Sequence, residues 1–119
     1  MIYHMVLFKV RPDVERATID AVFRELAALE GRIPGLLSFA GGPYSSAEGL
    51  NRGYDWGFCM TFDSARSRDA YLPHPAHEVV KGHVLEILDG GLDGVVAFDF
   101  DVRRQSLSST RGVPTSLGS

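Results

Sequence analysis

The sequence has little of the chemistry that several large classes of protein require. Its only cysteine, Cys59, excludes an intrachain disulfide, and its position inside an apolar run favours a small buried side chain over a nucleophile. No run of about 18 apolar residues is present, which excludes a transmembrane helix. The Gly41-Gly42-Pro43 run lacks the spacing of a Walker or Rossmann phosphate loop.

Positive charge is also scarce. Twelve lysines and arginines stand against fifteen acidic residues, a net charge of −3. This balance argues against a nucleic-acid partner or an anionic membrane surface. We therefore expect neither a nucleic-acid nor a membrane partner. The apolar residues 2–10 carry His4 and Lys9 and have neither a basic leader nor a small-residue cleavage site, so we expect a strand there and a cytoplasmic protein.

The 119 residues, 45% of them hydrophobic, are typical of one globular domain with a real core. Residues 1–102 contain the apolar patterns that such a domain needs. Residues 103–119 are rich in serine, threonine, glycine and proline and have almost nothing to bury. We predict a single domain over residues 1–102 followed by a disordered tail over residues 103–119.

Hydrophobic periodicity predicts the elements of that domain. Alternation with a period of two predicts strands over residues 2–10, 36–40, 56–62 and 95–102, with a polar loop from Gly41 onward. Helical spacing predicts one helix over residues 19–33, stopped at Pro34, and a second helix that breaks near Pro73 and Pro75. The order is that of an α+β, ferredoxin-like split βαβ fold, in which a four-stranded antiparallel sheet carries helices on one face.

The face of this sheet away from the helices is predicted to be strongly apolar. Period two assigns to it Tyr3, Met5 and Leu7 from the first strand and Val96, Phe98 and Phe100 from the last. Such an area is too large to leave in water on a monomer. We therefore expect a homodimer in which a second copy covers this face.

The segment from Tyr71 to His77 concentrates titratable and backbone-fixing residues where two helices meet. Pro75 suits the first turn of a new helix, and His77 follows just inside it. The positive end of the helix dipole disfavours the protonated imidazole, and a neutral imidazole can act as a base. A partly buried histidine with a structural role is the alternative.

An ordered set of motifs along residues 1–102 resembles the stress-responsive A/B barrel domain family, a branch of the dimeric α+β barrel proteins. The motifs are His4-Met5-Val6-Leu7-Phe8-Lys9, Ile33-Pro34-Gly35, Gly53-Tyr54-Asp55, Thr61-Phe62-Asp63-Ser64, Tyr71 with His74-Pro75-Ala76-His77, and Phe98-Asp99. The resemblance implies a homodimer whose two sheets close into one barrel, with a small-molecule pocket between the sheet and the helices of each subunit.

Two functions follow from the resemblance. Many members of the family are known only as stress-induced proteins, whereas one plant member is a polyketide cyclase, which this chain is similar to at His4, Phe23, Tyr71, His77 and Asp99. The first hypothesis is therefore a cofactor-independent lyase or cyclase that acts on a small apolar, polyketide-like carbonyl compound. The second is a stress-response protein that binds a small molecule without turning it over. Leu26 stands where the cyclase has a tyrosine, which leaves the substrate open.

In the catalytic hypothesis His77 is the general base, Tyr71 orients or protonates the substrate carbonyl, and His4 and Asp99 are supporting polar groups. Strand parity points His4 and Asp99 toward the helices from neighbouring strands. The same argument predicts a pocket lined by Val6, Phe8, Phe23, Leu26, Trp56, Phe58 and Met60, although a filled core would use the same residues. We expect no cofactor and no metal, because His74 and His77 lack an obvious third ligand. We do not expect a haem either, because no clear iron ligand is present beyond the same histidines.

Overall fold

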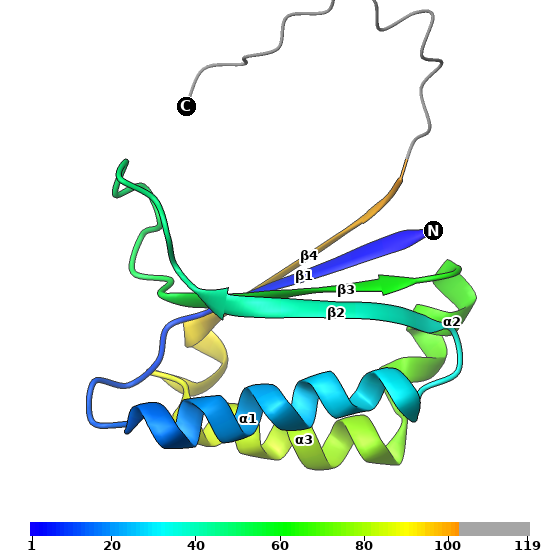
Figure 1. Cartoon of the computed structure of the whole chain (residues 1–119), viewed down its shortest axis with the longest axis horizontal. Coiled ribbons are helices and arrows are strands. Elements are labelled where there is room, and N and C mark those ends of the chain that lie inside the picture. Colours follow the sequence, from blue (N-terminus) through cyan, green and yellow to red (C-terminus); the bar gives the residue numbers. More distant parts are fainter. Residues whose placement is uncertain (103–119) are drawn as a thin grey trace, which may run out of the picture.

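A four-stranded antiparallel sheet in the order β2-β3-β1-β4 organises residues 1–102, the part of the chain that the computed structural model describes (Figure 1). Its strands are β1 (Ile2–Phe8), β2 (Leu36–Pro43), β3 (Trp56–Phe62) and β4 (Val95–Asp101). β1 lies between β3 and β4, and the register sets His4 opposite Met60 on one side and Asp99 on the other. The tail predicted for residues 103–119 lies outside the described residues.

Three helices cover one face of this sheet: α1 (Arg16–Ala28), α2 (Ala65–Tyr71) and α3 (Pro75–Ile87). α1 and α3 run side by side beneath the sheet, and the 3₁₀ turns η1 (Leu29–Gly31) and η2 (Gly91–Gly94) lead into β2 and β4 (Figure 1). The predicted α+β, ferredoxin-like fold is confirmed. Within residues 1–102, no helix has the length and apolar character needed to cross a membrane.

The core lies between the sheet and the helices, where the predicted strand alternation places it. On β3, Met60 and Phe62 have no exposed surface, whereas Cys59 and Thr61 on the opposite face remain partly exposed. The stripe of α1 contributes Ile19, Val22, Leu26 and, from η1, Leu29. Burying one such side chain contributes roughly 1.5–3 kcal/mol, so this contact fixes how the helices sit on the sheet.

Local capping fixes the two helix starts near the candidate site. The Ser64 hydroxyl accepts a hydrogen bond from the Ser67 backbone N–H at 3.1 Å, which caps α2. At the start of α3, Pro75 occupies the first turn and His74 Nδ1 accepts from the Ala76 N–H at 3.0 Å. The predicted helix break is therefore where the sequence placed it, and His74 is used as a cap.

Several boundaries differ from the sequence prediction: β1 ends at Phe8 rather than at Val10, and α1 begins at Arg16 rather than at residue 19. The α-helix ends at Ala28 rather than at Ile33, and the chain tightens into η1 before it leaves helical geometry ahead of Pro34. The predicted loop at Gly41 is instead the continuation of β2, which pairs with β3 as far as Pro43. A side chain at Gly41 would meet the Phe23 ring at 2.7 Å, so glycine here permits close packing.

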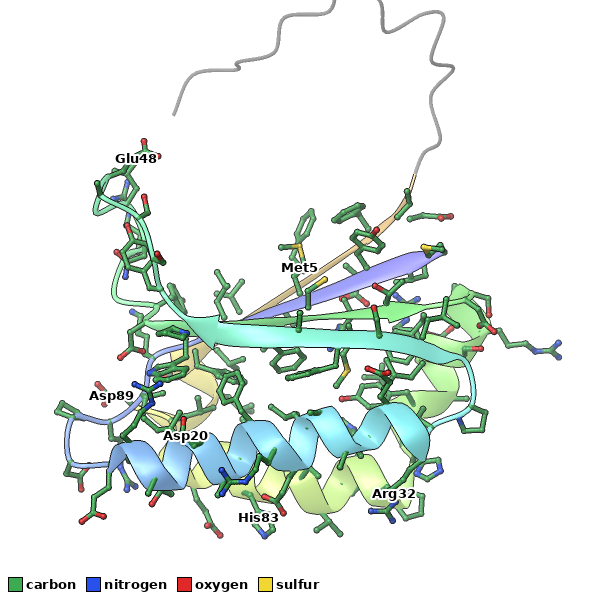
Figure 2. All side chains as sticks on the ribbon, viewed as in Figure 1. Met5, Asp20, Arg32, Glu48, His83 and Asp89 are labelled. Atoms are coloured by element: carbon green, nitrogen blue, oxygen red, sulfur yellow. The ribbon has the colours of Figure 1, made fainter. Side chains whose placement is uncertain are left out.

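The face of the sheet away from the helices is the outer face, and it is apolar as predicted. Figure 2 shows Met5 standing on this side, and the loop that joins β2 to β3 rises beyond it. Phe98 is 64% exposed, and Leu7, Val96 and Phe100 are exposed around it. Isolated apolar side chains are ordinary on a protein surface, but a continuous group of this size marks an interaction surface.

Candidate functional site

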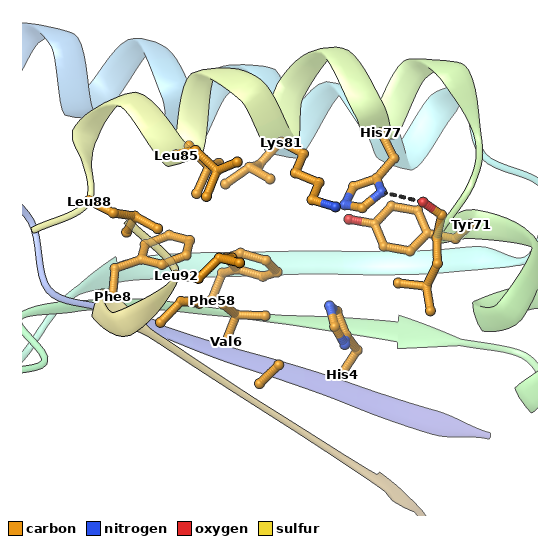
Figure 3. Close-up of a pocket in the computed structure, with 15 residues that line it drawn as sticks. His4, Val6, Phe8, Phe58, Tyr71, His77, Lys81, Leu85, Leu88 and Leu92 are labelled. Carbon is orange, nitrogen blue, oxygen red and sulfur yellow. Dashed lines mark hydrogen bonds between the residues drawn. The ribbon is translucent and has the colours of Figure 1, made fainter. Parts of the chain in front are cut away.

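A cavity of about 220 Å³ lies between the sheet and α3 (Figure 3). Its polar side chains are His4, Tyr71, His77 and Lys81. The other lining residues are Val6, Phe8, Leu26, Phe58, Leu72, Val84, Leu85, Leu88, Leu92, Val95 and Ala97. A few polar groups in a largely apolar cavity are the usual composition of a site for a small organic ligand. For scale, an engineered cavity of about 150 Å³ accepts benzene.

Tyr71 and His77 meet at one end of the cavity because the chain breaks between α2 and α3. Their ring centroids lie 4.2 Å apart. His77 Nδ1 is 2.9 Å from the Leu72 carbonyl oxygen, which can only accept, so Nδ1 carries the proton and donates it. This hydrogen bond leaves the Nε2 lone pair of His77 without that proton and available as a base.

The surroundings of both residues favour their neutral forms. Burial lowers the pKa of His77 below its ordinary value. The hydrogen bond to Leu72 and the charge of Glu78 oppose this shift, and the smaller effects of Lys81 and His4 add to it. Burial also raises the pKa of Tyr71, which is 1% exposed, so its hydroxyl keeps its proton at neutral pH. The site thus places a proton acceptor beside a proton donor.

His4 on β1 is fixed by a network that reaches from β4 to α2. Its Nδ1 lies 2.6 Å from Asp99 Oδ1, and the other carboxylate oxygen of Asp99 accepts from Arg68 Nη1 at 2.8 Å. The carboxylate can only accept, so His4 Nδ1 donates and its Nε2 is the remaining ring nitrogen. The ring centroids of His4 and Tyr71 lie 6.0 Å apart, so His4 is at the same end of the cavity as Tyr71.

The structure brings the four predicted catalytic residues together and places the predicted lining residues in two groups. His4, Tyr71 and His77 line the cavity, and Asp99 holds His4 from behind. Of the seven predicted lining residues, four line it: Val6, Phe8, Leu26 and Phe58.

The other three predicted lining residues lie outside the cavity. Met60 is fully buried in the core, while Phe23 and Trp56 pack on each other with centroids 5.3 Å apart. Strand parity and helix spacing predict which face of an element a side chain is on, but not where along that face the cavity lies. They therefore could not distinguish these three residues from those that line the cavity.

Sequence reasoning missed the wall that α3 and η2 supply. Lys81 and Leu85 follow His77 at intervals of four residues, the spacing of one helix face, and this signal could have found them. Leu92 in η2 has no comparable signal. Arg68 was also missed, since its partner Asp99 is 31 residues away in sequence.

Residues 1–102 contain no group of three or more histidine, cysteine, aspartate or glutamate side chains placed to hold a metal ion. A second, more open hollow of about 650 Å³ lies on the outer face beside Met5, Leu7 and Trp56. It shares Met5 and Leu7 with the apolar outer face and is otherwise lined by β2, β3 and the loop between them.

Comparison with known proteins gives three kinds of match. The model of the stress responsive A/B barrel domain family matches residues 2–102. A stress-response A/B barrel domain-containing protein of Arabidopsis thaliana, HS1, is 30% identical over 104 residues, which are 87% of this chain and 92% of that protein.

Among solved structures, a dimeric ferredoxin-like protein of unknown function from Jannaschia sp. CCS1 has a TM-score of 0.78 at 30% identity, over 85% of this chain and 98% of that one. A hydroxynitrile lyase from Passiflora edulis also has a TM-score of 0.78, over 88% and 95% of the two chains. Its identity of 13% means that this last likeness concerns the fold alone.

Proposed function

Since this chain belongs to the stress-responsive A/B barrel domain family, we propose that its cavity binds a small, largely apolar carbonyl compound and that the protein is a cofactor-independent lyase or cyclase. One observation carries the proposal. The Nε2 lone pair of His77 and the protonated hydroxyl of Tyr71 lie together at the polar end of an otherwise apolar cavity.

The reaction class follows from these two groups. His77 Nε2 takes a proton from a carbon next to a carbonyl, and the electron pair of the broken C–H bond moves to the carbonyl oxygen as an enolate. The Tyr71 hydroxyl donates a hydrogen bond to that oxygen. The enolate carbon then attacks a second carbonyl of the same molecule, and the new alkoxide takes a proton from the imidazolium, which restores His77. No metal or nucleotide takes part in this sequence.

The electrostatics of the site support the base assignment. A base must be unprotonated to act, and the lowered pKa of His77 keeps it so at neutral pH. In this proposal His4 lines the sheet side of the cavity, and the hydrogen bond from its Nδ1 to Asp99 fixes the orientation of its ring. General-base catalysis of this kind typically contributes roughly 10²- to 10⁴-fold.

We also propose that the protein acts as a homodimer whose outer faces pack together. The exposed Phe98, Phe100 and Leu7 support this, because burying them removes apolar surface from water. The dimeric state of the Jannaschia protein, which has the same fold at 30% identity, supports it too. A standard interface buries roughly 1,600 Å², which is within reach of a four-stranded sheet.

A second candidate function is binding without turnover, as the description of the Arabidopsis relative as a stress-response protein suggests. Binding needs only the cavity, whereas catalysis needs His77. The two candidates are separated by asking whether the protein removes a proton from the ligand that it binds.

The test uses 4-phenylbutan-2-one, a small apolar ketone, in D₂O. Nuclear magnetic resonance follows the replacement of hydrogen by deuterium at the carbons next to the carbonyl. We expect the protein to accelerate this exchange and His77→Gln to slow it at least about tenfold. The matched control is His83→Gln, because His83 is also on α3 but faces away from the sheet and pairs with Glu25 (Figure 2).

Equal loss in the His83 and His77 variants would refute the base assignment. Binding of the ketone without any acceleration would favour the second candidate. A protein that neither binds nor turns over the ketone would argue against this ligand class.

A further inference from the structure

Lys81 brings a positive charge to a cavity that is otherwise uncharged or apolar. It is on α3 one turn after His77, and its side chain extends back along the helix toward that residue (Figure 3). Lys81 lines the cavity and is also exposed to solvent, so its amine lies at the mouth of the cavity. Its charge reaches the interior, since it contributes to lowering the pKa of His77.

This amine has no acidic partner in the described part of the chain. Residues 1–102 contain seven ion pairs, and Lys81 is in none of them. No aspartate or glutamate from those residues lines the cavity. The nearby Asp99 already accepts from both His4 and Arg68. Glu78, one turn earlier on α3, also acts on His77, but it is exposed, does not line the cavity and makes no ion pair with Lys81. A cation beside an apolar wall, with no carboxylate lining the cavity, is complementary to an anionic group on a ligand.

We propose that the ligand of this cavity is a carboxylic acid with an apolar body, and that Lys81 binds its carboxylate at the cavity mouth. The inference rests on the proposed ligand cavity but not on the proposed proton transfer. In this orientation the apolar body extends toward Phe8, Leu88 and Leu92 at the other end (Figure 3). The carboxylate then also lies near His77, which places the adjacent carbons of the ligand within the reactive end.

A carboxylate fits this mouth better than a phosphate. One lysine supplies a single compact cation, whereas phosphate sites generally use several donors, such as arginine forks or successive backbone N–H groups. Within the described residues, Lys81 is the only lysine or arginine that lines the cavity.

The test compares two probes of the same shape, 4-propylbenzoate and its neutral amide 4-propylbenzamide, by isothermal titration calorimetry. We expect the unmodified protein to bind the benzoate about tenfold more tightly than the benzamide, because a charge-assisted hydrogen bond is added. Lys81→Met should weaken benzoate binding about tenfold and leave benzamide binding unchanged. Lys81→Arg should retain the preference for the benzoate.

The matched control is Arg24→Met, which removes the same charge from an exposed position of α1 that does not line the cavity. It should bind both probes as the unmodified protein does. A circular dichroism spectrum of each variant checks that the fold is retained.

The outcomes separate this inference from the proposed function. Two results would overturn the role of Lys81 while leaving the cavity in place. One is equal affinity of the unmodified protein for the two probes, and the other is an equal loss of affinity for both probes in Lys81→Met. Failure of both probes to bind would overturn the ligand cavity itself. A benzoate preference that depends on Lys81, in a protein without proton-transfer activity, would support this inference and refute only the catalytic proposal.

Discussion

Replacing Asp99 with asparagine should destabilise the protein and disturb the reactive end of the cavity together. Asp99 accepts from His4 at 2.6 Å and from Arg68 at 2.8 Å, one bond to each carboxylate oxygen. An asparagine has one acceptor atom, so a donor must face a donor at one of these two positions. The side chains of His4, Asp99 and Arg68 are 10%, 22% and 22% exposed, so water compensates only partly for the loss.

The magnitude follows from this geometry. Hydrogen bonds to charged groups contribute roughly 1.5–3 kcal/mol, and partial exposure reduces this figure. We expect Asp99→Asn to lower the free energy of unfolding by about 2 kcal/mol and Tm by about 10 °C for a domain of this size. Because His4 lines the cavity, ligand affinity should fall in the same variant.

Asp69→Asn is the matched control. Asp69 also accepts from Arg68, at 2.8 Å, but its side chain is 66% exposed. Both substitutions remove one negative charge beside Arg68, and they differ in burial and in the contact with His4. Asp69→Asn should lower the free energy of unfolding by less than about 0.5 kcal/mol.

The assay is urea unfolding followed by circular dichroism at fixed protein concentration, since a dimer makes the midpoint concentration-dependent. A double-mutant cycle with Arg68→Met should give a coupling energy of at least about 1 kcal/mol for Asp99. Equal losses for the two aspartate variants, or no coupling, would refute the reasoning that the His4–Asp99–Arg68 network holds this end of the cavity.

Three further predictions follow from single positions. Gly35→Ala should lower the free energy of unfolding in urea by more than about 2 kcal/mol, because φ is +85° and the new Cβ overlaps the Ser67 side chain. Gly53→Ala should lower it by about 1 kcal/mol, because φ is similar at +88° but the nearest atom to the new Cβ is 3.4 Å away. Equal losses in the two variants would contradict the steric argument. Phe98→Asp should convert the proposed dimer to a folded monomer by light scattering, and a monomeric unmodified protein would rule the dimer out. Because the native state lowers the pKa of His77, the unfolded state binds the proton more readily, so stability should be full above pH 6.5 and fall below it; His77→Gln should flatten that fall, and an unchanged pH profile would contradict the shift.

Local rules explain how much of the fold the sequence determined. The alternation on β1 and β3 separated the buried from the outer face, because successive side chains of a strand point to opposite sides whatever the strand packs against. Ser64 and Pro75 marked helix starts for a similar reason, since a cap needs only the first turn of its own helix. The grouping of His4 with Asp99 also followed from parity on two neighbouring strands.

The contents of the cavity were decided by tertiary structure alone. Phe58 and Met60 share one face of β3, yet Phe58 lines the cavity while Met60 is closed into the core, because the helices cover that face unevenly. The sequence predicted a loop at Gly41, but Gly41 belongs to β2 and leaves room for the Phe23 ring, which packs against it. Arg68 reaches Asp99 only because α2 packs near β4. Periodicity assigns a side chain to a face, but the packing of one element on another decides which of those side chains meet and where space remains for a ligand.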